Sequence, residues 1–188
     1  MRIVGGKHRG RALQAPAGLD TRPTSDRVRE SVFNILRHGK WHDGILEGAL
    51  VMDVFAGTGA LGLEALSQGA VHAVFVERDR KAIEACRQNI AAMGEEAVSL
   101  VMASDALALP SKPLNLPPRT LIFLDPPYGK NMGGEALAHL LVGGWLAAGA
   151  VCVLEMSKKA PEEKIPDAFK VTDERTYGIA QVLFLMKP

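Results

Sequence analysis

The sequence predicts an α/β fold with a mostly parallel, doubly wound sheet, because apolar strand segments alternate with helical segments through its middle. Short apolar runs at residues 50–55, 73–76 and 120–124 are typical of strands that are covered on both faces. Right-handed crossovers join such strands into a doubly wound sheet. We expect ligands to bind at the carboxyl ends of these strands.

The N-terminal 40 residues predict a small hairpin followed by a helix. Two β-like pieces, residues 2–4 and 11–13, flank a basic turn that is rich in glycine. Residues 21–26, Thr-Arg-Pro-Thr-Ser-Asp, have the composition of a helix start, and apolar residues recur at helical spacing at positions 28, 32, 35 and 36. We expect this helix to dock on the main domain and to leave Arg22, Arg27 and Arg29 on its other faces.

The charge of the chain is unevenly distributed. Residues 1–40 contain nine Lys or Arg against three Asp or Glu, a net charge of +6, whereas residues 41–188 contain thirteen against eighteen, a net charge of −5. A basic end on an acidic body is typical of a protein that contacts a polyanion, although a solvated surface segment can have the same composition. We therefore divide the chain into a basic N-terminal extension (1–40) and a main domain (41–188).

Several classes of protein are excluded by composition. Two cysteines, Cys86 and Cys152, are too few for a disulfide framework, and the five histidines lack the spacing of metal ligands. The first residues lack the apolar region of a signal peptide, and the longest uncharged apolar stretch, 140–154, is shorter than the ~20 residues needed to span a bilayer. We expect a cytoplasmic protein without a metal.

The first core strand runs into a turn in which Gly57, Gly59 and Gly62 have the G-x-G-x-x-G spacing. Glycines at these positions allow a tight bend and close approach of a nucleotide, although a glycine-rich turn can also simply join a strand to a helix. No Gly-Lys-Ser/Thr sequence follows, which excludes a P-loop. Asp53 would repel a pyrophosphate, which disfavours NAD, but it suits a cationic ligand such as S-adenosylmethionine.

Further acids follow the other predicted strands. Glu77 lies twenty residues after Gly57, where a doubly wound nucleotide fold places the carboxylate that accepts both ribose hydroxyls. Asp105, after a strand at 98–102, can bond an adenine amine or cap its own loop. Asp125 follows the fourth strand, so four acids converge on one edge of the sheet. The predicted cofactor site consists of Asp53, Phe55, Ala56, Gly57, Thr58, Gly59, Glu77, Arg78, Asp105 and Ala106.

The remaining segments complete the predicted fold. A helix begins after Asp79, which suits an N-cap, and stops at Gly94. Prolines between 110 and 118 forbid a regular helix there. A helix at 135–142, a fifth strand at 150–154, and an antiparallel hairpin of residues 169–175 and 179–186 follow.

The segment Asp125-Pro126-Pro127-Tyr128 has the chemistry of a site that methylates an amine of a nucleobase. Both prolines fix their φ angles and lack an N–H, so this stiff segment offers acceptors. Acceptors on the amine hydrogens, here the Asp125 carboxylate and the Pro126 carbonyl, favour a more tetrahedral nitrogen and relieve its developing positive charge. Tyr128 offers a face for stacking on an extruded base. Lys130 can meet a phosphate or remain solvated.

These motifs together resemble the RsmD family of bacterial small-subunit ribosomal RNA guanine-N2 methyltransferases, over essentially the whole chain. The resemblance rests on residues 2–6, 9–11, 21–30, 53–62 and 125–128, of which the arginine-rich segment 21–30 is the most specific. Tyr128 stands where phenylalanine is frequent in that family, a change that preserves the stacking face.

The resemblance implies methyl transfer from S-adenosylmethionine to the 2-amino group of one guanine in 16S ribosomal RNA, within an assembled or assembling small subunit. It also implies that the basic extension binds RNA. The residues that we expect to contact RNA are Arg9, Arg11, Arg22, Thr24, Arg27, Arg29 and Lys130. Spacing alone does not distinguish guanine from adenine, so an adenine-N6 methyltransferase acting on DNA stays open, as does a non-catalytic RNA-binding assembly factor.

Overall fold

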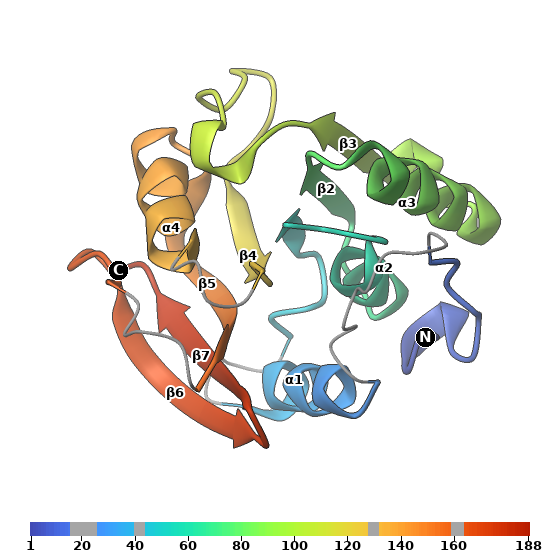
Figure 1. The fold of residues 1–188 in the computed structure, drawn as a ribbon, viewed down its shortest axis with the longest axis horizontal. Helices are drawn as coiled ribbons and strands as arrows, with labels where there is room; N and C mark the ends of the chain where they lie inside the picture. Colours follow the sequence, from blue (N-terminus) through green and yellow to red (C-terminus); the bar gives the residue numbers. More distant parts are fainter. Residues whose placement is uncertain (16–25, 40–43, 128–131, 159–163) are drawn as a thin grey trace.

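The protein contains one seven-stranded sheet with the strand order β3-β2-β1-β4-β5-β7-β6 (Figure 1). The computed structural model describes residues 1–15, 26–39, 44–127, 132–158 and 164–188. The strands are β1 (Leu50–Val54), β2 (His72–Glu77), β3 (Ser99–Ala103), β4 (Arg119–Leu124), β5 (Leu146–Ser157), β6 (Lys170–Tyr177) and β7 (Ala180–Met186). Strands β1 to β5 are parallel, and β7 and β6 add an antiparallel hairpin beside β5. The predicted fold class is therefore confirmed.

Helices cover both faces of this sheet. They are α1 (Asp26–His38), α2 (Ala60–Ser67), α3 (Arg80–Met93) and α4 (Met132–Val142), with short 3₁₀ turns η1 (Gly6–His8), η2 (Glu96–Val98) and η3 (Ala106–Ala108). Asp79 caps α3 by accepting hydrogen bonds from the N–H groups of Lys81 and Ala82, and Gly94 ends it with φ +70°, as the sequence predicts. Among the described residues no helix is long and apolar enough to cross a membrane.

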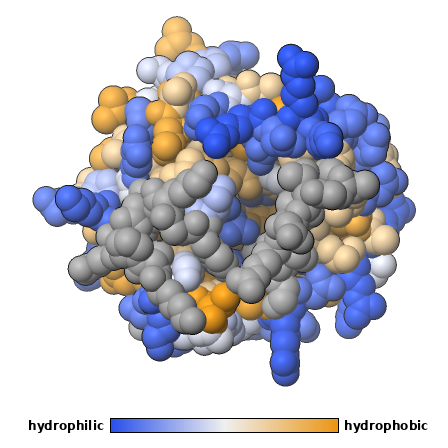
Figure 2. All heavy atoms as spheres, viewed as in Figure 1, coloured by the Kyte–Doolittle hydropathy of each residue, from blue (hydrophilic) through white to orange (hydrophobic). Residues whose placement is uncertain are grey.

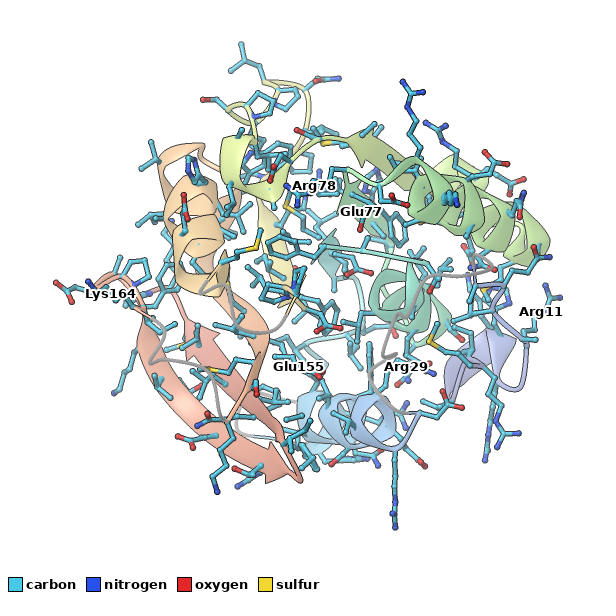
Figure 3. All side chains as sticks on the ribbon, in the orientation of Figure 1. Arg11, Arg29, Glu77, Arg78, Glu155 and Lys164 are labelled. Atoms are coloured by element: carbon cyan, nitrogen blue, oxygen red, sulfur yellow. The ribbon has the colours of Figure 1, made fainter. Side chains whose placement is uncertain are left out.

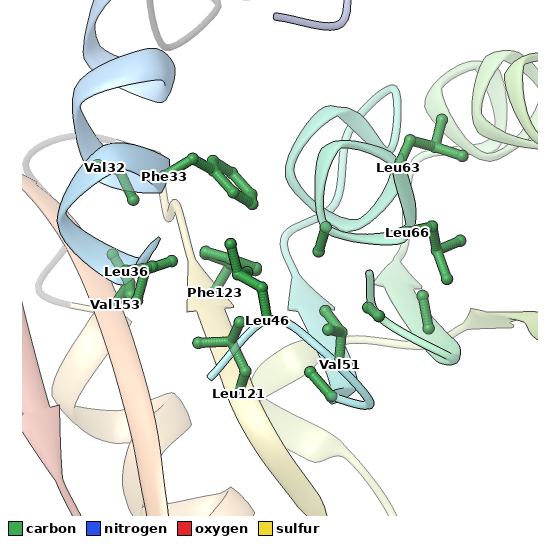
Figure 4. Close-up of a cluster of buried hydrophobic side chains, with 14 of the residues drawn as sticks. Val32, Phe33, Leu36, Leu46, Val51, Leu63, Leu66, Leu121, Phe123 and Val153 are labelled. Carbon is green, nitrogen blue, oxygen red and sulfur yellow. The ribbon is translucent and has the colours of Figure 1, made fainter. Parts of the chain in front are cut away.

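The strands alternate their side chains between two buried clusters, one on each face. Val51, Leu121 and Phe123 belong to one cluster, which α1, α2 and α3 complete (Figure 4). Met52 and Ile122 belong to the other, which contains residues of α4 and η3. A sheet buried on both faces requires apolar residues at consecutive strand positions, which explains the continuous apolar runs in the sequence.

Two predicted elements extend further in the structure by three or more residues at one end or both. The fourth helix begins at Met132 rather than at residue 135, and β5 extends from Leu146 to Ser157 rather than from 150 to 154. The extension past residue 154 follows from antiparallel pairing with β7, in which Glu155 lies opposite Val182 and Ser157 opposite Ala180. Between residues 109 and 118 the structure contains no helix or strand, as the prolines predict.

The N-terminal segment forms a minimal hairpin on the main domain. Arg2 and Ala12 form an isolated antiparallel bridge, and η1 occupies the turn between them. Ile3 and Phe33 are buried in the same cluster as the strands, so this segment and α1 share the core. The docking of α1 is thus confirmed, whereas the division of the chain at residue 40 stays a prediction.

Candidate functional site

The candidate site lies at the carboxyl ends of β1 to β4. Strand β1 lies between β2 and β4, so the chain leaves β1 toward one edge of the sheet and returns on its other side to β4. In open α/β sheets this reversal of strand order opens a crevice for ligands. Asp53 lies within β1, Glu77 ends β2, and Asp105 and Asp125 follow β3 and β4. The four predicted acids therefore belong to one edge of the sheet.

The turn from β1 to α2 needs its glycines for two different reasons. A β-carbon on Gly62 would collide with the ring of Phe75, so glycine permits the close packing of α2 on β2. Gly57 has φ +55° and no atom within 4 Å of the position of a β-carbon, so its backbone faces open space. Phe55, with φ +63°, is the non-glycine residue in the described chain with a positive φ, a conformation that costs about 1–3 kcal/mol. Such strain is typical of ligand-binding turns.

Asp53 is a buried carboxyl beneath this turn. Its side chain is 1% exposed, and its Oδ2 accepts a hydrogen bond of 2.8 Å from the N–H of Gly62. Burial raises the pKa of Asp53 from 3.8 to about 8, against the lowering effect of the Gly62 hydrogen bond, and the charges of Asp125 and Glu77 raise it further. Asp53 is therefore protonated near neutral pH in the free protein, and a cation bound beside it would favour its charged form.

Glu77 joins the glycine turn to the start of α3. Its Oε2 accepts from the N–H of Gly57 at 2.9 Å, and its Oε1 accepts from the N–H groups of Arg78 and Asp79 at 2.8 and 2.9 Å. Figure 3 shows Glu77 and Arg78 together at the end of β2. Each carboxylate oxygen has a second lone pair, so the half-buried group, already oriented by the backbone, can accept further hydrogen bonds.

Asp105 caps its own loop, which is one of the two roles that the sequence leaves open. Its Oδ1 accepts from the N–H of Leu107 at 3.0 Å, and its Oδ2 forms an ion pair with Arg78 at 2.7 Å. These two contacts lower the pKa of Asp105. The ion pair fixes Arg78 across the ends of β2 and β3. The other predicted cofactor residues, Ala56, Thr58, Gly59 and Ala106, are all buried in the turns around this crevice.

The Asp-Pro-Pro segment continues from the end of β4, beside the end of β1. The N–H of Asp125 lies 3.4 Å from the carbonyl oxygen of Val54, which extends the pairing of β4 with β1. Asp125 is half-buried, Pro126 is buried and Pro127 is exposed. Tyr128 and Lys130 lie outside the described residues.

The prediction that Arg29 contacts RNA is wrong. Its side chain is fully buried, because position 29 falls on the same helical stripe as Val32 and Leu36. The guanidinium pairs with Glu64 at 3.4 Å and with Asp26 at 2.8 Å, and it also donates to the carbonyl oxygen of Arg2. A buried charge of this kind needs such partners.

Glu64 is the residue that sequence reasoning missed. Its carboxylate is fully buried and accepts hydrogen bonds of 2.8 Å from the N–H groups of Val4 and Gly5, besides contacting Arg29. It therefore connects the N-terminal segment, α1 and α2 at one point. The available signal was an isolated acid in the otherwise apolar helix that follows the glycine turn.

The Lys and Arg residues of the N-terminal hairpin and of α1 other than Arg29 are exposed. Arg9, Arg11 and Arg27 are exposed, and Arg11 donates to the carbonyl oxygen of Ala92 at 2.7 Å. Arg22 and Thr24 lie outside the described residues. A groove of about 470 Å³ separates Gln14 from the first turns of α3, and its lining includes Arg80 and Lys81. On the face of the molecule that Figure 2 shows, hydrophilic side chains gather on the side where α3 lies.

The residues of the crevice fit an adenosyl ligand with a cationic amino-acid part. Gly57 offers backbone without a side chain in the way, Glu77 offers acceptors for hydroxyl groups, and Asp53 gives up its proton more readily beside a cation. Across the described residues, no group of three or more His, Cys, Asp or Glu side chains could hold a metal ion.

Comparisons with known proteins agree with this geometry. A family profile described as "Conserved hypothetical protein 95" matches residues 1–186. "Putative rRNA methyltransferase YlbH" of Bacillus subtilis is 35% identical over 188 residues, covering 100% of this chain and 99% of that protein. "Ribosomal RNA small subunit methyltransferase D" of Escherichia coli K12 is 34% identical over 178 residues, covering 95% and 85%. The solved structure "Putative methyltransferase yhhF from Escherichia coli" superposes with a TM-score of 0.83 at 34% identity, covering 100% of this chain and 97% of that one.

Proposed function

Because the chain belongs to the RsmD family, which the matching profile describes as conserved hypothetical protein 95, we propose that it methylates one guanine of 16S ribosomal RNA at the 2-amino group. The fold is that of S-adenosylmethionine-dependent methyltransferases, and methylation of ribosomal RNA is the activity that the names of its relatives support. The observation that supports the chemistry best is the position of the Asp-Pro-Pro segment beside the end of β1, next to the acids of the crevice.

S-adenosylmethionine is the cofactor. When bound, it supplies a methyl carbon on a cationic sulfur that leaves as a neutral thioether. We assign the ribose hydroxyls to Glu77, the cationic amino-acid part to the region of Asp53, and the adenine to the loop of Asp105 and Ala106. In this arrangement Glu77 is oriented by three backbone N–H groups before any ligand binds, which reduces the ordering cost of binding.

The protein activates the base amine mainly by accepting hydrogen bonds and by positioning. The Asp125 carboxylate and the Pro126 carbonyl accept hydrogen bonds from the two N–H groups of the amine, which favours a tetrahedral nitrogen with an available lone pair. As the nitrogen gains a methyl group it loses one proton, which Asp125 can accept and pass to solvent. Fixing the reacting atoms in line is worth up to ~7–11 kcal/mol, so positioning supplies a large share of the rate enhancement.

The proposed RNA surface consists of the exposed basic residues of the N-terminal segment and the nearby groove beside α3. Arg9, Arg11 and Arg27 supply phosphate contacts, and we keep Arg22, Thr24 and Lys130 as expected contacts. Arg29 acts inside the protein instead, by fixing α1 against Glu64. The substrate in this proposal is an assembled or assembling small subunit, which places the enzyme in the cytoplasm with the ribosomes.

The test is methyl transfer from labelled S-adenosylmethionine to three acceptors: small subunits from a strain that lacks this protein, naked 16S RNA, and duplex DNA. We expect label in the RNA of the small subunits, as N2-methylguanine. Label in the adenines of DNA would favour the adenine-N6 alternative. Binding of the donor without transfer to any acceptor would favour a non-catalytic assembly factor.

A further inference from the structure

One buried amide on α3 connects the N-terminal segment with the glycine turn of the cofactor crevice. Asn89 is 1% exposed, and its Oδ1 accepts a hydrogen bond of 2.8 Å from the N–H of Gln14. Its Nδ2 donates to the carbonyl oxygens of Gln14 and Thr58, each at 3.0 Å. Thr58 lies between Gly57 and Gly59 in the turn that follows β1. The two hydrogens of one amide nitrogen are therefore shared between the N-terminal segment and the turn.

This amide keeps its bonds only while Gln14 and Thr58 hold their spacing. Both amide hydrogens are used, and the reversed amide would place an oxygen against two carbonyl oxygens, so the network determines its orientation. A buried carbonyl that loses its hydrogen bond costs free energy, because water does not replace the donor. A displacement of the turn therefore acts on Gln14, and a displacement of Gln14 acts on the turn.

Gln14 also forms one wall of the groove beside α3. The groove has a volume of about 470 Å³, and its opposite wall includes Arg80, Lys81 and Glu84. Two cations face one acid there, and the Glu84 carboxylate also accepts from Gln88 at 3.0 Å. A groove with this charge suits a phosphate group of RNA. The α3 amide thus fixes a wall of the groove against the turn of the cofactor crevice.

The hairpin that precedes Gln14 is held by other contacts. Glu64 accepts hydrogen bonds of 2.8 Å from the N–H groups of Val4 and Gly5, and Ile3 is buried in the core. Figure 1 shows this hairpin beside α2 and α3. Removal of the α3 amide therefore leaves the docking of the hairpin in place and changes the position of Gln14.

We propose that Asn89 is a positioning residue that couples cofactor binding at the glycine turn to RNA binding at the groove beside α3. This assignment rests on the proposed function and adds the connection between its two binding sites. The cofactor meets the turn at Gly57, whose backbone faces open space, and RNA meets the wall that Gln14 forms. A ligand that fixes one segment fixes the other through the shared amide, so each ligand binds more tightly when the other is bound.

The experiment measures the affinity for unmethylated small subunits, from a strain that lacks this protein, with and without S-adenosylhomocysteine. This compound has no methyl group to transfer, so binding is measured without reaction. We expect saturating S-adenosylhomocysteine to tighten binding of the wild-type protein at least about fivefold, because couplings between sites are typically about 5- to 150-fold. In Asn89→Leu, which has a similar volume but no hydrogen-bonding group, this factor should fall below about twofold. Asn115→Leu makes the same change at an exposed asparagine and should retain the wild-type factor.

A second variant breaks the same contact from the exposed side. Gln14→Pro removes the N–H that Asn89 accepts and places a ring carbon there, so it should lower the factor as Asn89→Leu does. This variant leaves the buried residues of α3 unchanged, so it tests the contact if Asn89→Leu does not fold.

The ratio of the two affinities separates coupling from a structural role. A purely structural role would weaken binding of the small subunit equally with and without S-adenosylhomocysteine and leave the factor unchanged. Equal wild-type affinities in the two states, or a wild-type factor in folded Asn89→Leu or Gln14→Pro, would overturn the assignment. Absence of binding to the small subunit in both states would contradict the proposed function instead, so the two failures are distinguishable.

Discussion

Replacing Asp53 by asparagine should stabilise the free protein at neutral and alkaline pH while weakening binding of the cofactor. Burial raises the pKa of this carboxyl from 3.8 to about 8. Between these two pH values the folded protein keeps a proton on Asp53, whereas the unfolded chain has lost it. A raised pKa contributes stability that is fully present below the unfolded value and is lost as pH rises through about 8. Asparagine keeps an oxygen that can accept the Gly62 N–H but does not titrate.

The magnitude follows from the size of this shift. Each unit corresponds to about 1.4 kcal/mol, so a rise of about four units is worth on the order of 5 kcal/mol between pH 4 and pH 8. We expect the difference in unfolding free energy between Asp53→Asn and wild type to grow with pH by about 1.4 kcal/mol per unit over this range. Urea unfolding between pH 5 and pH 8 without ligand measures it.

Cofactor binding should change in the opposite direction. Loss of a charge-assisted contact worth about 1.5–3 kcal/mol weakens affinity by about 10- to 100-fold, which calorimetry with S-adenosylmethionine measures. The exposed residue Asp167 provides the control, since Asp167→Asn should leave both stability and affinity unchanged. Parallel stability curves for Asp53→Asn and wild type, or undiminished affinity, would refute this reasoning.

Three further predictions concern the other parts of the account. Asp125→Asn should lower kcat for methyl transfer by at least about 100-fold and leave cofactor affinity within a few-fold, because its carboxylate acts on the amine. Arg9→Gln and Arg27→Gln should each reduce the slope of log affinity for RNA against log salt concentration by ~0.7–0.9, because each removes one phosphate contact. Glu64→Ala should lower the unfolding free energy by about 3–5 kcal/mol, because it removes the buried carboxylate that pairs with the Arg29 guanidinium and accepts from the N–H groups of Val4 and Gly5, whereas Glu84→Ala at an exposed site should change it by less than about 0.5 kcal/mol.

Each of these three predictions has its own contradicting result. Equal loss of transfer and cofactor affinity in Asp125→Asn would place that residue in the cofactor site. An unchanged slope of log affinity against log salt concentration would mean that Arg9 and Arg27 are solvated and do not contact RNA phosphates. Unaltered stability of Glu64→Ala would mean that the contacts of this carboxylate contribute little to the fold.

Local patterns were sufficient to predict the sheet and its acidic edge. Apolar runs, the glycine spacing and the acids after each strand depend on residues close together in the sequence, which is why Asp53 and Glu77 were found. Helical spacing places position 29 on the stripe of Val32 and Leu36, but its charge suggested an exposed arginine, because its buried partner Glu64 lies 35 positions away in the sequence.

The most direct measurement is the identity of the methylated nucleotide in small-subunit RNA from strains with and without this protein. We predict that mass spectrometry finds a single N2-methylguanine in 16S RNA that disappears when the protein is absent and returns with the wild-type chain but not with Asp125→Asn. An unchanged set of methylated nucleotides, or loss of a methyl group from adenine, would contradict the account.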